Sequence, residues 1–292
     1  MPVTALVSAK SCGVTAAALA LTLASKRPSL LAECDPAGGT IRAGLLAGQA
    51  NAGFGLYHLA RAERTGPEAL AHAFAAHLWP LDPSGHRQLL PGLTDPAQAA
   101  ALTRTWPALA DVLQVMAQQA GHDVFIDAGR LALEAGHLHP TLTPAPLLYR
   151  ADLVLLVVRG TDQSLALARH VIAPLRTALQ EHGSGGDALG LLLIEDGAYR
   201  AHQVGEALQT PVLAALPHDL DTAHYLTDGG RPPRGYGRSP LLRYARTAAE
   251  QLEALANRRQ IQQQRVPAAP QLAGILQRLN HQHREGGAAT HG

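Results

Sequence analysis

Short apolar runs alternate with amphipathic or alanine-rich stretches along most of the chain. The apolar runs predict buried strands at 3–9, 28–33, 86–92, 122–129, 151–160, 188–196 and 211–219. The stretches between them predict helices at 14–25, 53–79, 95–103, 106–121, 161–179, 200–209 and 239–258. Strands and helices that alternate at this spacing favour right-handed βαβ units. We therefore expect an α/β fold, with a doubly wound, mostly parallel sheet and helices on both faces.

The length of the chain allows a large core. Its 292 residues, of which 47% are hydrophobic, are enough for one α/β domain or for two smaller ones. The alternating pattern is continuous over 1–257, which we expect to form one domain. A polar stretch that ends in proline, "RRQIQQQRVPAAP", then predicts a linker at 258–270.

One short segment beyond that linker again has a helical pattern. Residues 271–283 are expected to form a short amphipathic helix, whose apolar positions are Leu272, Ile275, Leu276 and Leu279. A helix this short is marginal alone in water, so its apolar face needs a surface on which to dock. The final residues, 284–292, are expected to be disordered.

Composition favours a cytoplasmic protein. No apolar run reaches the roughly 18 residues of a membrane span, and two cysteines in this length suit a reducing compartment. The net charge is +1, but the residues from Arg231 onward carry ten arginines against three glutamates. This basic third predicts an anionic partner: DNA, an acidic lipid surface or an acidic protein. The simpler alternative is that these arginines only solvate the last helices.

The stretch "SAKSCGVTA" lies between the first predicted strand and the first predicted helix, where a phosphate-binding loop is found in other proteins. The pattern G-x-x-x-x-G-K-[ST] places Ser8 at its first glycine, Gly13 at its second, Val14 at its lysine and Thr15 at its hydroxyl. Gly13 lets the backbone approach an anion, and the amides that open the helix favour one. The residues expected to line a nucleotide here are Lys10, Ser11, Cys12, Gly13, Val14, Thr15 and Ala16. A strand-turn-helix without any ligand remains the alternative.

Three later stretches follow this loop in a characteristic order: "LLAECDPAGG" at 30–39, "HDVFIDAG" at 122–129 and "ADLVLLVVRG" at 151–160. Together with "SCGVTA" and the late segment "LPHD", they resemble the MinD/ParA superfamily of deviant Walker-type ATPases. In the D-x-D-P-x-G motif of that family, Glu33 stands at the first aspartate, and Asp35 matches the second. The resemblance implies a P-loop NTPase fold, with ATP or ADP and Mg²⁺ as cofactors.

The resemblance also implies roles for particular residues. Asp35 falls on the position that activates the attacking water. Asp127 falls on the position that holds Mg²⁺ through water, with Thr15 as a second magnesium contact. Pro217 and Asp219 fall in the late segment, near which the nucleotide base lies. The alternative for Asp35 and Asp127 is that they are helix caps or strand-end carboxylates.

Both lysines that this family carries in its first loop are missing from their places. The position of the signature lysine is Ala9, and that of the second lysine is Val14. Positioned cations contribute on the order of 10³-fold or more to phosphoryl transfer. We therefore expect a retained architecture with weak or absent ATP hydrolysis.

The departures from the family pattern resemble degenerate members such as the TadZ/CpaE branch and actinobacterial chromosome-partitioning relatives. That resemblance implies a homodimeric localisation or scaffolding factor at the inner face of the membrane. Its partner would be a secretion or pilus ATPase, other polar machinery, or a membrane surface bound through the apolar face at 272–279.

Two other functions remain open. One is a slow ParA-like ATPase that binds DNA non-specifically through Arg231, Arg234, Arg238, Arg243, Arg246, Arg258 and Arg259. The other is a binding module that uses no nucleotide.

Overall fold

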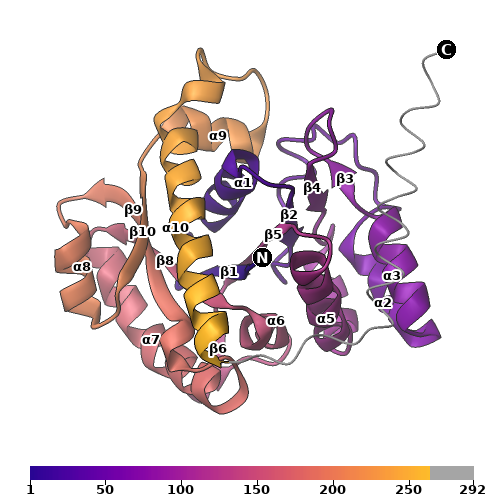
Figure 1. Cartoon of the computed structure of the whole chain (residues 1–292), viewed down its shortest axis with the longest axis horizontal. Helices are drawn as coiled ribbons and strands as arrows, with labels where there is room; N and C mark the ends of the chain where they lie inside the picture. The colour runs from indigo at the N-terminus through magenta and orange to yellow at the C-terminus, as the bar shows by residue number, and fades with distance from the viewer. Residues whose placement is uncertain (264–292) are drawn as a thin grey trace.

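The computed structural model describes residues 1–263, and within them an eight-stranded sheet forms the centre of the molecule (Figure 1). The strand order is β10-β9-β8-β1-β5-β2-β4-β3, and every neighbouring pair is parallel except β3 and β4. The strands are β1 (Val3–Ser8), β2 (Ser29–Glu33), β3 (Trp79–Pro80), β4 (Arg87–Leu90), β5 (Asp123–Arg130), β8 (Leu153–Gly160), β9 (Leu189–Gly197) and β10 (Val212–Pro217). A separate hairpin pairs β6 (Leu133–Glu134) with β7 (His137–Leu138).

Helices cover both faces of this sheet. They are α1 (Val14–Ala24), α2 (Leu59–Thr65), α3 (Pro67–Ala76), α4 (Ala99–Leu102), α5 (Thr105–Gln118), α6 (Ala145–Arg150), α7 (Asp162–His182), α8 (Ala201–Leu208), α9 (Leu220–Asp228) and α10 (Pro240–Gln263). Single 3₁₀ turns lie at η1 (Leu56–His58), η2 (Pro96–Gln98), η3 (Gly186–Ala188) and η4 (Tyr236–Arg238). The expected doubly wound, mostly parallel sheet is confirmed.

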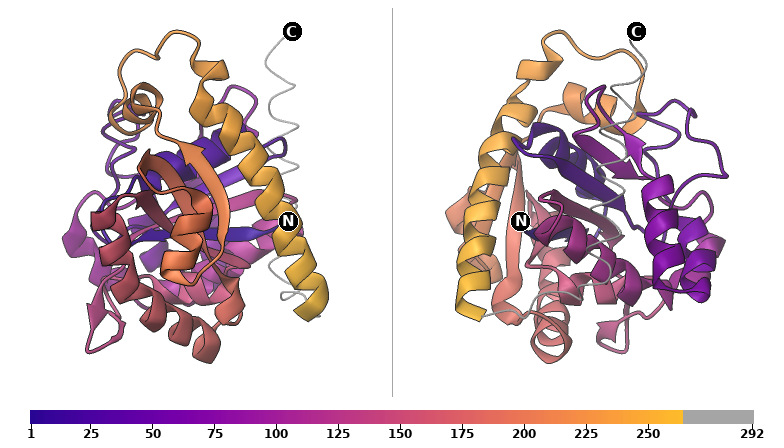
Figure 2. Two further views of the ribbon diagram at one scale, coloured as in Figure 1. Left: turned by 90° about the vertical axis from the view of Figure 1, so that its left-hand side faces the viewer. Right: turned by 45° about the vertical axis from the view of Figure 1, so that its right-hand side comes forward.

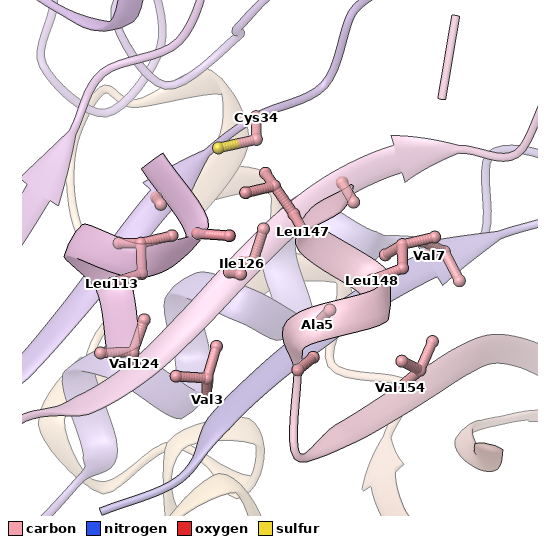
Figure 3. Packing of buried hydrophobic residues seen from close by; sticks show 14 of the residues in the cluster. Val3, Ala5, Val7, Cys34, Leu113, Val124, Ile126, Leu147, Leu148 and Val154 are labelled. Atoms are coloured by element: carbon pink, nitrogen blue, oxygen red, sulfur yellow. The ribbon is translucent and has the colours of Figure 1, made fainter. Parts of the chain in front are cut away.

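The alternation of side chains along each strand creates two apolar layers. Val3, Ala5 and Val7 of β1 face α5, α6 and α7, and Figure 3 shows them among Leu113 of α5 and the α6 leucines. Leu6 faces the opposite way, into a layer formed by α1, α9 and α10. Figure 2 shows α10 lying along the outside of that layer, and it packs against both α1 and β10. The first helix is therefore buried, which explains its apolar, alanine-rich composition.

Because the central strands are parallel, their carboxyl ends lie at one edge of the sheet. The segments that follow β1, β2, β5, β8, β9 and β10 all leave from this edge. Ligands of doubly wound sheets bind at such an edge, next to the point where the strand order reverses. The topology therefore brings together the loop after Ser8 and the motifs after β2 and β5.

Helix α10 corrects the expected domain boundary. It continues to Gln263, so residues 258–263 of the expected linker at 258–270 are helical. Arg259 explains this extension, because its guanidinium donates to the backbone oxygens of Asp152 (3.2 Å) and Ser184 (2.9 Å) and pairs with Asp187. The helical stretch expected over 53–79 is divided between η1, α2 and α3, and its last residue lies in strand β3.

The remaining expectations for the C-terminal segment lie outside the described residues. They are the rest of the linker, the amphipathic helix at 271–283 with Leu272, Ile275, Leu276 and Leu279, and the tail at 284–292. Within residues 1–263, no helix is both long enough and apolar enough to cross a bilayer.

We predict that Arg259→Ala lowers the free energy of unfolding by about 2 kcal/mol, since it removes hydrogen bonds of a mostly buried guanidinium. The matched control is Arg258→Ala, because Arg258 is its exposed neighbour and should change stability by no more than about 0.5 kcal/mol. Urea unfolding monitored by circular dichroism measures both variants. Equal midpoints for the two would show that Arg259 does not anchor α10.

Candidate functional site

The loop between β1 and α1 has the backbone geometry of an anion site. Gly13 caps α1 in the left-handed conformation, with φ 89° and ψ 33°. A side chain there would be strained by the positive φ, whereas the space around its Cα is open. The first amides of a helix have no partner within the helix, and the helix dipole favours a negative charge at this end. The loop can therefore accept phosphate oxygens.

Val14 explains the positive charge that this loop lacks. Val14 is 6% exposed and packs into the apolar layer with Leu6 and Leu155. The place where the phosphate-loop pattern has a lysine is thus part of the core and carries no charge. Lys10 and Ser11 are exposed. Cys12 is buried, with its Sγ 3.7 Å from Oγ of Ser164 at the start of α7.

The structure brings the two expected magnesium contacts together. Thr15 Oγ1 donates a hydrogen bond of 2.6 Å to Asp127 Oδ2, and the Gly129 amide donates to Asp127 Oδ1 at 3.0 Å. Burial raises the pKa of Asp127 to about 7; the Thr15 hydrogen bond opposes this shift, and the charges of Glu33 and Asp35 add to it. A hydroxyl and a carboxylate oxygen side by side suit Mg²⁺, which takes few protein ligands and keeps the rest of its shell as water and phosphate.

Asp35 lies next to this pair. Its Oδ1 accepts from the Ala37 amide at 2.8 Å, which closes the turn after β2. A Cβ on Gly129 would overlap the Asp35 carboxylate, so the two residues are in direct contact. Burial raises the pKa of Asp35, while the Ala37 amide and the charge of Arg130 lower it. The expected neighbourhood of Asp35, Asp127 and Thr15 is thus present at the edge of the sheet.

Glu33 has a role that the sequence did not indicate. Its Oε1 accepts from the amides of Thr40 (2.8 Å) and Ile41 (3.0 Å), and its Oε2 accepts from the Gly92 amide (2.7 Å). Burial raises its pKa, and the three amides oppose that shift. The carboxylate therefore fixes the long segment after Asp35 to the segment after β4. The sequence signal was a carboxylate at the end of an apolar strand, but its partners are too far along the chain to be inferred.

The late segment is held by hydrogen bonds at the start of α9. Pro217 ends β10, and Asp219 caps α9 by accepting from the Thr222 amide (3.2 Å) and hydroxyl (2.8 Å). Asp219 also accepts from the Leu241 amide at 3.3 Å, so it joins α9 to α10. Asp219 thus has a structural role, and the contact of this segment with a base stays a prediction.

A polar cluster that the sequence did not predict ties together the ends of three strands. Asp196 accepts from Arg159 Nη1 at 2.9 Å and lies 3.3 Å from Nδ1 of His218. These residues come from β8, β9 and the residue after β10. The two cysteines, by contrast, are both free and lie in opposite apolar layers, Cys12 with α1 and Cys34 with α5. They are not joined by a disulfide.

Comparison with known proteins gives a structural match. No protein-family model matches the chain, and a search of curated proteins finds none similar to it. Among solved structures, the chain is similar to the septum site-determining protein MinD of Pyrococcus horikoshii OT3, complexed with Mg-ADP. The identity is 17%, the match covers 88% of this chain and 98% of that one, and the TM-score is 0.62.

Two further solved structures agree with this match. A ParA family ATPase from Chlorobium tepidum TLS is 16% identical over 86% of this chain and 98% of that one, with a TM-score of 0.59. The MinC:MinD cell division protein complex of Aquifex aeolicus gives 15% identity over 87% and 96%, with a TM-score of 0.61. Similarity at this level of identity concerns the fold. The described part of this chain has the P-loop NTPase fold of the MinD and ParA-family ATPases.

Proposed function

We propose that this chain is a MinD/ParA-like protein that binds ATP or ADP with Mg²⁺, hydrolyses ATP weakly or not at all, and acts as a localisation or scaffolding factor in the cytoplasm. One observation carries the proposal. The contacts suited to a bound nucleotide are present, with Thr15 Oγ1 2.6 Å from Asp127 Oδ2, while Val14 is built into the core. The loop thus keeps the groups for binding and lacks the lysine for transfer.

Support for a nucleotide comes from the fit of the residues to it. Gly13 and the first amides of α1 would receive the phosphates, and Thr15 and Asp127 would hold Mg²⁺ directly or through water. The similar MinD of Pyrococcus horikoshii is complexed with Mg-ADP. When bound, the metal would neutralise phosphate charge and favour the ionised form of Asp127. The loss of a positioned lysine costs about 10³-fold in transfer rate, which favours slow or absent turnover.

We predict that Thr15→Val weakens the binding of Mg-ADP by about tenfold and leaves metal-free ADP unchanged, because the hydroxyl contacts the metal. Valine keeps the branched shape at this position. Calorimetry on the full chain, with and without Mg²⁺, measures both affinities. Arg61→Ala, at an exposed arginine of α2, is the control and should bind like the natural protein. An unchanged magnesium effect in Thr15→Val would rule out this metal contact.

For partners, we propose a homodimer that recruits other proteins, such as a secretion or pilus ATPase in the manner of the TadZ/CpaE branch. The MinC:MinD complex shows that a protein with this fold is assembled with a protein partner. The apolar positions at 272–279 would dock on that partner or on the inner face of the membrane. Deleting 266–292 should abolish polar foci of a fluorescent fusion. Foci that persist would exclude this role of the segment.

Non-specific DNA binding is the second candidate. It is favoured by the exposure of most of the basic residues considered for it, namely Arg231, Arg234, Arg238, Arg243, Arg246 and Arg258. Arg259 is excluded from this surface, since it is engaged with Asp152, Ser184 and Asp187. This candidate requires DNA binding that falls with salt and weakens in the double variant Arg243→Ala, Arg246→Ala. DNA binding indifferent to that change would contradict it.

A further inference from the structure

We infer that Arg130 supplies the positive charge that faces the phosphates, in place of the two lysines that the first loop lacks. The inference rests on the proposed function, because it needs a nucleotide at this edge of the sheet. It assigns a binding role to a residue that lies outside every motif of the sequence.

The pairing of β1 with β5 shifts in register just before Arg130. Leu6 lies opposite Asp127, but two residues later Ser8 lies opposite Arg130, so β5 contains one residue more than β1 over this stretch. Such a bulge leaves one residue unpaired and breaks the alternation of side chains. Gly129, with φ +67°, occupies it. Without the bulge, Arg130 would face away from Asp127.

The bulge determines the side of the sheet to which Arg130 is directed. Partners in a parallel ladder project on the same side of the sheet. Leu6 packs in the α1 layer, and its partner Asp127 contacts Thr15 of α1. Ser8 is two residues after Leu6 and shares its face, so Arg130 opposite Ser8 is directed to the α1 side. The Leu131 amide donates to the Ser8 oxygen at 2.9 Å and holds Arg130 at the start of the loop.

The site carries several carboxylates, which makes a nearby positive charge important. Glu33, Asp35 and Asp127 gather around the place where phosphates would bind, and each raises the cost of adding more negative charge there. The charge of Arg130 reaches this group, because it lowers the pKa of Asp35. The Asp35 carboxylate also lies against Gly129, the residue before Arg130. Arg130 is therefore a cation close to these carboxyls.

The guanidinium of Arg130 is accessible to a ligand. Arg130 is exposed at the end of β5, and no hydrogen bond or salt bridge engages it within the described residues. It has no partner to give up when it turns to a ligand. A guanidinium stays charged at any working pH and presents parallel N–H groups that match two phosphate oxygens. Arg159, another cation of this edge, is already held by Asp196.

The test measures nucleotide affinity on the full chain by calorimetry with Mg-ATP, Mg-ADP and magnesium pyrophosphate, which has no base. We expect Arg130→Ala to weaken all three by about tenfold or more, as for the loss of one charged hydrogen-bonding group. Arg130→Lys should recover part of the affinity, since it keeps the charge without the fork. Arg61→Ala is the matched control and should leave all three affinities unchanged. Thermal unfolding confirms that each variant is folded.

Each outcome decides one claim. Binding by the natural chain with undiminished affinity in Arg130→Ala would overturn the inference and leave the proposed function standing. Loss for the nucleotides but not for pyrophosphate would also overturn it, because the effect would then concern the base. Absence of nucleotide and pyrophosphate binding by the natural chain would overturn the proposed function, and the inference with it.

Discussion

Glu33→Ala is expected to lower the free energy of unfolding by about 4 kcal/mol, since each buried amide left without an acceptor costs about 1–3 kcal/mol. Three amides depend on this carboxylate, those of Thr40, Ile41 and Gly92. Removing a buried charge offsets part of the loss, because that charge is costly to keep out of water. The net effect remains large since the three donors come from two different segments.

Urea unfolding at neutral pH measures this effect, with Glu68→Ala as the matched control. Glu68 is exposed on α3, so its replacement should change stability by no more than about 0.5 kcal/mol. Glu33→Gln should fall between the two, because the amide side chain keeps one acceptor oxygen. If Glu33→Ala were as stable as Glu68→Ala, Glu33 would not hold the segment after Asp35 in place.

Asp127→Asn is expected to stabilise the protein at alkaline pH and to leave it unchanged in acid. In the fold the pKa of Asp127 is raised to about 7 from an ordinary 3.8. A raised carboxyl pKa means that the folded state keeps a proton that the unfolded state has lost. The contribution of the Asp127 carboxyl to the free energy of unfolding is complete below about pH 4. It is lost as the pH rises through about 7, at up to ~1.4 kcal/mol per pH unit.

Asparagine does not titrate, so Asp127→Asn removes this loss. Its Nδ2 can donate to Thr15 Oγ1, while its Oδ1 still accepts from the Gly129 amide. At pH 8 we expect the variant to be more stable than the natural chain by about 2–4 kcal/mol, with no difference near pH 4. Urea unfolding at a series of pH values gives the difference curve, in which other titrating groups cancel. Asp221→Asn, at an exposed carboxyl of α9, is the control. A flat curve for Asp127→Asn would show that the charge of Asp127 does not destabilise the fold.

A carboxylate that destabilises the empty fold, as Asp127 does, is expected at a site that binds a cation. A buried group whose charge is unfavourable in the empty fold is stabilised when a cation arrives, so stability is given up for affinity. Asp127→Asn should therefore lose affinity for the magnesium complex of a nucleotide while it gains stability. The two effects have opposite signs and come from the same carboxylate.

Much of this edge could be predicted from the sequence because its geometry follows from strand order. Thr15 follows β1 and Asp127 lies near the end of β5. These two parallel strands are neighbours in the sheet, so their carboxyl ends had to meet. The sequence also showed that a positive charge is missing at Val14. Its burial in the α1 layer was not, because a single valine at a helix start fits a surface or a core equally well.

What the sequence could not indicate depends on register and on long-range contacts. The partners of Glu33 include Gly92, which lies in another loop and carries no side chain to mark it. The bulge at Gly129 shifts Arg130 to the other side of β5, and nothing in the alternation of "FIDAGR" distinguishes a bulged strand from a regular one. For Asp219, the sequence could not indicate the helix cap that the structure shows. A carboxylate after a strand can serve a ligand or cap the next helix, and here it caps α9.

We propose that the chain binds a magnesium nucleotide but lacks the charge to cleave it. The most direct measurement follows Mg-ATP on the full chain in one sample, with binding by calorimetry and released phosphate over the same period. We expect saturable, magnesium-dependent binding with the bound ATP recovered intact. Steady release of phosphate, or no binding at all, would contradict it.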